Sequence, residues 1–124
     1  MNDYTTGIDI IEIKRIREVL NKHGERFLSR ILTGKEIKYC LSFSKPELHL
    51  AGRFAAKEAY SKSIGTGIGK DYSWKDIEIL NNDRGKPIIY HLRENDFSKY
   101  KFDVSISHTE EYACAVVVCV KPLR

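Results

Sequence analysis

Residues 52–67, GRFAAKEAYSKSIGTG, decide the fold that we expect, because they read as most of a long helix followed by a glycine turn. Pro46 fits the first turn of that helix, so we predict that it runs from Pro46 to about Ile64. Steps of three and four residues return to the same helical face. One narrow stripe therefore contains Ala51, Ala55, Glu58 and Lys62. Small alanines let another element approach closely, and the Glu58 carboxylate would project into that contact.

Glu58 and Lys62 have two interpretations. They are spaced as a surface pair at positions i and i+4, which is common and stabilises a helix by only a few tenths of a kcal/mol. A surface pair does not need alanine neighbours, however. The alternative is that Glu58 is a carboxylate in apolar surroundings and has a chemical role.

A second isolated carboxylate occurs in residues 5–13, TTGIDIIEI, whose β-branched residues predict a strand. One face of this strand would carry Gly7, Asp9, Ile11 and Ile13, and the other Ile8 and Ile10. A buried carboxylate is costly unless a cation or several donors pair with it, so a salt bridge or a backbone cap is one interpretation of Asp9. The other is that Asp9 and Glu58 hold Mg²⁺ together with substrate phosphates, with Lys62 on a phosphate oxygen.

The rest of the chain predicts an α+β fold, with helices mostly in the first half and antiparallel strands mostly in the second. The predicted elements are helices at residues 14–24 and 25–32, a third helix that begins with a Thr33–Glu36 capping box, and hairpins formed by residues 74–80 with 87–92 and by residues 102–108 with 112–120. The last strand is apolar on both faces, which indicates a central position or burial in a subunit interface. We expect one domain, residues 1–124, with helices packed on a small antiparallel sheet.

Composition excludes several classes of protein. The 124 residues are 42% hydrophobic and 31% charged, the net charge is +4, and no apolar run is long enough for a membrane span. Cys40, Cys114 and Cys119 lack metal-site spacing, so we expect reduced thiols in a soluble, cytoplasmic protein. The basic first helix suggests a module for RNA or an acidic protein as an alternative. Because the aromatic residues are not interleaved with the cations, we expect no nucleic-acid partner.

Three further motifs are weaker. In SIGTGIGK, Gly65 caps the long helix and free amides in the turn can hold a phosphate, although the pattern is not a P-loop. RGKP, residues 84–87, is a hairpin turn whose two cations suit a phosphate or nucleotide edge. Ser107 and His108 are adjacent on a strand and point opposite ways, which argues against a hydrolase triad.

Four stretches together resemble one known family. They are TGIDIIEI, GRFAAKEAYSKSIGTGIG, DRGKP and VSISHTEEYACAVV, in the order and spacing of the holo-acyl-carrier-protein synthases, which are small bacterial 4′-phosphopantetheinyl transferases. The resemblance covers most of the chain and implies the transferase fold, assembled as a homotrimer with the site between subunits. It also implies Mg²⁺-dependent transfer of 4′-phosphopantetheine from coenzyme A to a serine of an acidic apo acyl carrier protein. That reaction releases 3′,5′-ADP and supports fatty acid biosynthesis.

The resemblance also implies roles for individual residues. Asp9 and Glu58 match the pair that holds the metal on the coenzyme A diphosphate, Lys62 matches a lysine that contacts the phosphates, and His108 completes the expected catalytic set near the nucleotide. The expected coenzyme A cleft comprises Arg53, Lys62, Gly65, Thr66, Gly67, Gly85, Lys86, Pro87 and His108. The expected carrier-docking surface comprises Arg15, Arg26, Phe27 and Arg30. The acceptor of the serine proton stays open between Glu58, our first choice, and Asp9.

Overall fold

The structure, a computed structural model, describes residues 3–69 and 72–122 of the chain. Its elements in chain order are β1 (Tyr4–Glu12), α1 (Ile13–His23), α2 (Glu25–Ile31), α3 (Gly34–Leu41), α4 (Pro46–Ser63), a short 3₁₀ helix η1 (Trp74–Asp76), β2 (Ile77–Asn81), β3 (Pro87–His91), β4 (Lys101–His108) and β5 (Tyr112–Val120). The α+β prediction is therefore confirmed.

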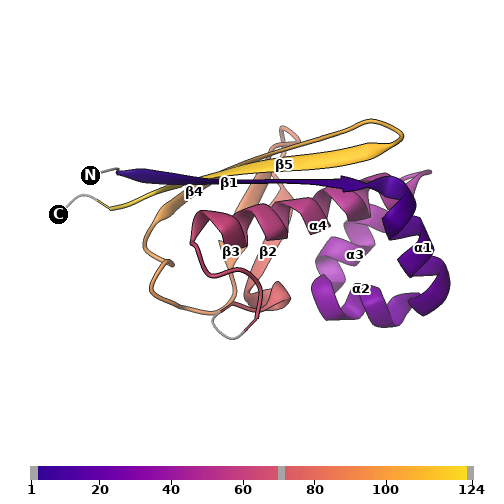
Figure 1. Cartoon of the computed structure of the whole chain (residues 1–124), viewed down its shortest axis with the longest axis horizontal. Coiled ribbons are helices and arrows are strands. Elements are labelled where there is room, and N and C mark those ends of the chain that lie inside the picture. The colour runs from indigo at the N-terminus through magenta and orange to yellow at the C-terminus, as the bar shows by residue number, and fades with distance from the viewer. Residues whose placement is uncertain (1–2, 70–71, 123–124) are drawn as a thin grey trace.

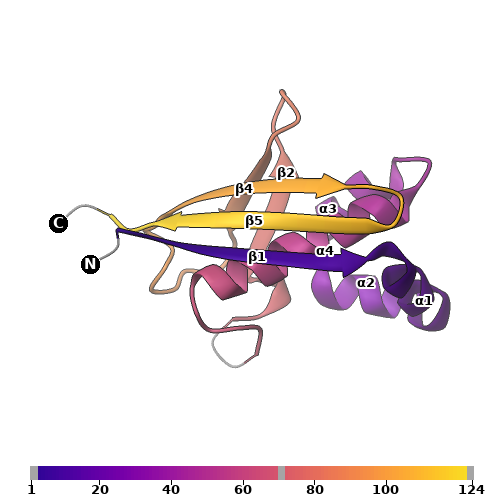
Figure 2. The ribbon, with the colours of Figure 1, turned by 45° about the horizontal axis from the view of Figure 1, so that its top comes forward.

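The strands form two antiparallel units. β1, β5 and β4 make a three-stranded sheet in that order, and β2 pairs with β3 as a hairpin. β5 is the central strand of the sheet, which was one of the two interpretations of its apolar faces. Figures 1 and 2 show α4 packed beneath this sheet, with the β2–β3 hairpin crossing behind the helix.

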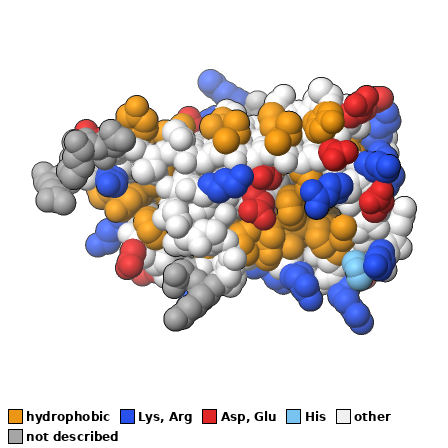
Figure 3. Space-filling view, viewed as in Figure 1, with side chains coloured by type: hydrophobic (Ala, Val, Ile, Leu, Met, Phe, Trp, Pro, Cys, Tyr) orange, Lys and Arg blue, Asp and Glu red, His pale blue; other side chains and the backbone are white. Residues whose placement is uncertain are grey.

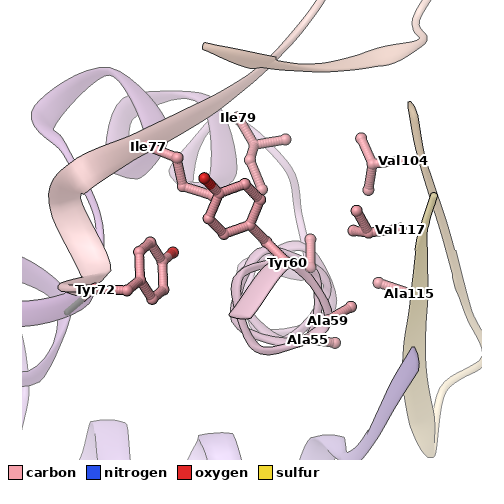
Figure 4. Packing of buried hydrophobic residues seen from close by; sticks show 10 residues of the cluster. Ala55, Ala59, Tyr60, Tyr72, Ile77, Ile79, Val104, Ala115 and Val117 are labelled. Carbon is pink, nitrogen blue, oxygen red and sulfur yellow. The ribbon is translucent and has the colours of Figure 1, made fainter. Parts of the chain in front are cut away.

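A hydrophobic cluster encloses α4 from both sides (Figure 4). β2 contributes residues on one side and the three-stranded sheet contributes residues on the other. The buried members labelled in Figure 4 are Ala55, Ala59, Tyr60, Tyr72, Ile77, Ile79, Val104, Ala115 and Val117. α4 is therefore a central helix, and the small residues on its sheet side allow the sheet to lie close to it.

The helix boundaries follow from local chemistry, as predicted. α1 ends where Gly24 adopts φ +54°, a conformation that favours glycine. Thr33 and Glu36 form the expected capping box at the start of α3, with the Thr33 N–H donating to Glu36 Oε1 at 2.8 Å. Pro46 occupies the first turn of α4.

Two predicted boundaries were wrong. Ile13, expected at the end of the first strand, is the first residue of α1. Residues 74–76 form η1 and not the start of a strand. The reason is local, because the Ser73 N–H donates to Asp76 Oδ2 at 2.9 Å while the Asp76 N–H donates to the Ser73 carbonyl at 3.0 Å. These reciprocal hydrogen bonds hold a tight turn before β2 begins.

β1 lies directly against α4 at Gly7. A Cβ atom at this position would overlap the carbonyl oxygen of Ala59 and lie 2.7 Å from the Ser63 backbone nitrogen. Only glycine therefore permits this approach. Ala59, which lies outside the stripe identified from sequence, makes the contact, and the approach brings Asp9 of β1 toward the C-terminal half of α4.

A fully buried ion pair anchors the opposite side of α4. Lys57 Nζ lies 2.8 Å from Glu36 Oε1, and both side chains are 0% exposed. The same ammonium donates to the carbonyl oxygens of Ile31 at 2.9 Å, Trp74 at 2.8 Å and Ile77 at 3.1 Å. Burial lowers the pKa of Lys57, and the Glu36 carboxylate opposes that shift. Because Lys57 binds α2, α3, η1 and β2 at once, it fixes the rotation of α4 about its axis.

Two further sequence predictions concern thiols and membranes. Cys40, Cys114 and Cys119 are free, and the last two lie on opposite faces of β5. None of the helices within residues 3–69 and 72–122 has both the length and the apolar character needed for a membrane span.

Gly7→Ala is expected to destabilise the protein strongly, because β1 and α4 must separate to make room for the added methyl group. We expect a loss of about 2–4 kcal/mol in the free energy of unfolding, measured by urea denaturation. Gly34→Ala is the matched control, since a Cβ added there meets nothing within 4 Å apart from its chain neighbours and the backbone of its own helix. Similar losses for the two variants would contradict the close-contact argument.

Candidate active site

A cavity of about 440 Å³ lies between β1, α1, α2 and α4. Its charged lining consists of Asp9, Arg15, Glu58 and Lys62, and its apolar wall consists of Ile10, Ile11, Ile16, Val19, Phe27 and Phe54. Figure 3 shows the face formed by β1, α4 and α1, where acidic side chains lie between Lys or Arg side chains and next to hydrophobic ones. The structure thus brings together the three residues predicted to bind metal and phosphates.

Lys62 bridges from α4 to β1. Its Nζ donates to the carbonyl oxygen of Ile8 at 2.9 Å and lies 3.2 Å from Asp9 Oδ1. Asp9 therefore forms a salt bridge in this structure, as one interpretation predicted. Lys62 pairs with Asp9 of β1 and not with Glu58 of its own helix. The Lys62 side chain is 52% exposed and the Asp9 side chain 17% exposed, so the lysine can also meet a ligand that enters the cavity.

The environment of Glu58 is less favourable for a negative charge than that of Asp9, which pairs with Lys62. Burial raises its pKa, the neighbouring Asp9 carboxylate raises it further, and the Lys62 ammonium lowers it. The described residues contain no group of three or more His, Cys, Asp or Glu side chains that could hold a metal ion. Asp9 and Glu58 together nevertheless suit a hard divalent cation whose other ligands are water or phosphate oxygens, because such a cation would relieve the charge on both carboxylates.

Four of the residues predicted for the coenzyme A cleft lie in a different pocket. Arg53, Gly85, Pro87 and His108 line a space of about 160 Å³, together with Tyr39, His49, Asn81 and Ile106. Arg53 precedes Lys62 by nine residues on α4, a rotation of about 180° at roughly 100° per residue. The two cations therefore point to opposite sides of the helix, and His108 is separated from the Asp9–Glu58 pair within one chain.

The other predicted cleft residues make internal contacts. Lys86 Nζ lies 2.7 Å from Asp103 Oδ1 and donates to the Val104 carbonyl at 3.2 Å. The N–H groups of Gly65 and Gly67 donate to the carbonyls of Lys62 at 3.1 Å and Ser61 at 3.3 Å. α4 therefore uses these two amides to end its last turn, and the expectation that free amides hold a phosphate stays a prediction for the other residues of the turn. Thr66 lines another cavity, of about 430 Å³.

The predicted carrier-docking residues are continuous with the carboxylate cavity. Arg15 lines the main cavity, while Arg26 and Arg30 line a neighbouring one of about 200 Å³. Phe27 lines both cavities and thus joins them. The three arginines are exposed around this partly buried aromatic ring, which is a suitable surface for an acidic partner.

Sequence reasoning missed four residues of the smaller pocket: Tyr39, His49, Asn81 and Ile106. His49 precedes Arg53 by four residues, so the i, i+4 spacing could have indicated that they share a helical face. Tyr39 and Asn81 come from α3 and β2, and only the packing of these elements on α4 places them beside Arg53.

Glu58→Gln is expected to raise the thermal midpoint of the ligand-free protein at pH 7 by on the order of 1–3 °C. A raised carboxyl pKa means that the folded state favours protonated Glu58. The contribution of protonated Glu58 to the stability of the folded protein is complete below the ordinary pKa of 4.5. It is lost as the pH rises through the pKa that Glu58 has in the folded state. The difference in midpoint should therefore disappear near pH 4.

The exposed Glu18 of α1 supplies a control, because Glu18→Gln removes the same formal charge outside the cavity. A lower midpoint for Glu58→Gln than for the unsubstituted protein at pH 7 would contradict the interpretation of Glu58.

Known proteins resemble this chain over most of its length. The family model described as the 4′-phosphopantetheinyl transferase superfamily matches residues 5–117. The holo-[acyl-carrier-protein] synthase of Protochlamydia amoebophila is 51% identical over 114 residues, which cover 90% of this chain and 93% of that protein. The synthase of the same name from a Geobacillus species is 49% identical over 114 residues, with 90% and 92% covered.

Solved structures agree with these sequence relatives. A crystal structure of the holo-(acyl-carrier-protein) synthase of Bacillus anthracis in complex with coenzyme A (3′,5′-ADP) is 45% identical, with a TM-score of 0.83 and 95% of this chain and 96% of that chain covered. The Helicobacter pylori synthase in complex with coenzyme A is 38% identical, with a TM-score of 0.84 and 92% and 98% covered. The chain therefore belongs to the 4′-phosphopantetheinyl transferase superfamily, as a member of its holo-[acyl-carrier-protein] synthases.

Proposed function

We propose that this protein transfers 4′-phosphopantetheine from coenzyme A to a serine hydroxyl of an apo acyl carrier protein. The serine oxygen attacks the β-phosphorus of the coenzyme A diphosphate, and the bond from that phosphorus to the bridging oxygen breaks. 3′,5′-ADP leaves with the electron pair of that bond. The observation that carries the proposal is the cavity in which Asp9, Glu58 and Lys62 lie together and which Phe27 joins to the arginine surface.

Asp9, Glu58 and Lys62 would bind the diphosphate and position it. Lys62 is half-exposed, so its ammonium can donate to a phosphate oxygen while negative charge grows during bond cleavage. Asp9 and Glu58 would hold Mg²⁺, which when bound neutralises charge on the diphosphate. The apolar wall of the cavity would exclude water from the reacting phosphorus.

Glu58 is our proposed acceptor for the serine proton. Its raised pKa brings it nearer to the working pH than an ordinary glutamate, which favours proton acceptance. Asp9 is the alternative, but in this structure its carboxylate already pairs with Lys62 at 3.2 Å.

The carrier protein would dock beside this cavity. Arg15, Arg26 and Arg30 are exposed, and the Phe27 ring lies between the two adjoining cavities. Positive charge on this surface would attract an acidic recognition helix and increase the association rate. We further propose that the protein acts in the cytoplasm and that its product supports fatty acid biosynthesis; three free thiols suit a reducing compartment.

We propose a homotrimer with the complete site between neighbouring subunits. On the side of the sheet away from α4, the part formed by β1 and β5 is mainly apolar and is uncovered in the single chain. Exposed side chains on this face include Tyr4, Ile8, Ile10, Tyr112, Val116 and Val120. Contacts between subunits would bury this face. They would also let Lys62 of one copy and Arg53 of the next bind one coenzyme A, although these side chains point to opposite sides of α4.

Incubation with coenzyme A, Mg²⁺ and an apo acyl carrier protein is expected to add one phosphopantetheine to the carrier, measured by mass spectrometry. Glu58→Ala should keep the fold, judged by circular dichroism, and reduce the rate by at least about 10²-fold. Glu94→Ala, an exposed change after β3, should keep the full rate. The absence of a mass increase with any bacterial carrier would contradict the proposal.

Mixing two inactive variants tests the shared site. Glu58→Ala and Arg53→Met each damage one of the two pockets, so trimers formed from an equal mixture should recover activity at up to about a quarter of the sites. Sedimentation should give three times the 14.3 kDa chain mass. No recovery after verified subunit exchange would place both pockets' functions within one chain and overturn the shared-site proposal.

A further inference from the structure

The pocket lined by Arg53 and His108 contains a second histidine, His49, at its edge. The His49 ring stacks on Phe43 with centroids 3.6 Å apart and an interplanar angle of 16°. It also meets the His108 ring edge-on, at 5.3 Å and 73°. Two imidazoles from α4 and β4 therefore share one small space with a guanidinium.

Arg53, which lines this pocket, has one hydrogen-bond donor that no described residue uses. The residue is 5% exposed, its Nη2 donates to Asn81 Oδ1, and its guanidinium lies 4.7 Å from the centroid of the Tyr39 ring. Its Nε atom is buried and has no hydrogen-bond partner among the described residues. A buried N–H without an acceptor is unfavourable, so a ligand that supplies one would be stabilised.

The described lining of this pocket contains no carboxylate to balance these cations. The groups that face His49 are Arg53 on its own helix, Tyr39 on α3 and His108 on β4, while the lining part of the β2–β3 hairpin, Asn81 with Gly85 and Pro87, is uncharged. Glu110, two residues after His108, already pairs with Lys45 at 2.7 Å. The volume of about 160 Å³ and the surplus of donors suit a compact anion such as a phosphate group.

We infer that His49 is a proton-linked ligand for a phosphomonoester: when the nucleotide half of the substrate binds its phosphate beside Arg53 and His108, His49 takes up a proton from solvent and strengthens the contact. This inference rests on the proposed function and adds a regulatory property to the nucleotide pocket. The protein would thereby distinguish nucleotides that carry the phosphomonoester from those that lack it, and more strongly as the pH falls.

The sign of the pH effect follows from the empty pocket. Burial lowers the pKa of His49, and the positive charges of His108 and Arg53 lower it further, so His49 is neutral above its ordinary pKa of 6.5. A dianion beside the ring favours the charged form and raises that pKa on binding. Affinity should therefore increase as the pH falls from 8 to about 6.5, a window in which the phosphate itself, with a second pKa of about 6, stays mostly dianionic.

Titration calorimetry with 3′,5′-ADP at pH 8.0 and pH 6.5, in two buffers of different ionisation enthalpy, tests this inference. The unsubstituted protein should take up protons on binding and bind more tightly at pH 6.5. His49→Phe keeps a ring to stack on Phe43. In this variant the ratio of the affinity at pH 6.5 to the affinity at pH 8.0 should be smaller than in the unsubstituted protein by roughly threefold to tenfold. His49→Gln gives the same test if the phenylalanine variant is unstable.

Two controls isolate the residue and the phosphate. His23→Phe removes an exposed histidine at the end of α1, outside this pocket, and should leave the pH profile of nucleotide binding unchanged. Dephospho-coenzyme A, whose phosphates form only a diphosphate diester and which therefore lacks the phosphomonoester of coenzyme A, should show no dependence on His49. Equal pH profiles and equal proton uptake in His49→Phe and the unsubstituted protein would overturn the inference and leave the proposed function intact. Failure of the unsubstituted protein to bind 3′,5′-ADP at either pH would overturn both.

Discussion

The contact of β1 with α4 at Gly7 is the constraint on which the functional part of this structure depends. Because a side chain at position 7 would overlap the Ala59 carbonyl, the strand can lie directly on the helix only with glycine there. Asp9 follows two residues later on the same face of β1 and meets Lys62 at 3.2 Å. A strand held farther away would break the Asp9–Lys62 contact and widen the cavity that both residues share with Glu58.

The buried Lys57–Glu36 pair complements that contact from the opposite side. A charge in the core is tolerated here because Lys57 also has three carbonyl partners. Successive helical residues differ by about 100°, so fixing Lys57 toward α3 and β2 directs Glu58 toward the cavity. The adjacent residues Lys57 and Glu58 thus point to different sides of α4. Lys57 has a structural role, and we propose a catalytic role for Glu58.

Capping residues, glycine and proline predicted most helices and strands correctly. Contacts between residues distant in sequence could not be predicted in this way. Gly24, Thr33 with Glu36, and Pro46 act on neighbouring backbone, so their effects were readable from sequence. The turn at residues 74–76 was missed because a Ser73–Asp76 capping pattern overrode the strand pattern. Free amides were predicted in the turn after α4, and the end of the helix uses those of Gly65 and Gly67.

The element types and the face shared by Glu58 and Lys62 were predictable from the sequence, and the resemblance in its motifs indicated the family. These properties depend on residue spacing and on hydrogen bonds between near neighbours. Only the tertiary structure decided that Lys62 pairs with Asp9, that Arg53 lies on the opposite side of α4, and that His49 joins it in a second pocket. Such contacts arise between elements distant in sequence, so they depend on how β1, α3 and β4 pack around one central helix.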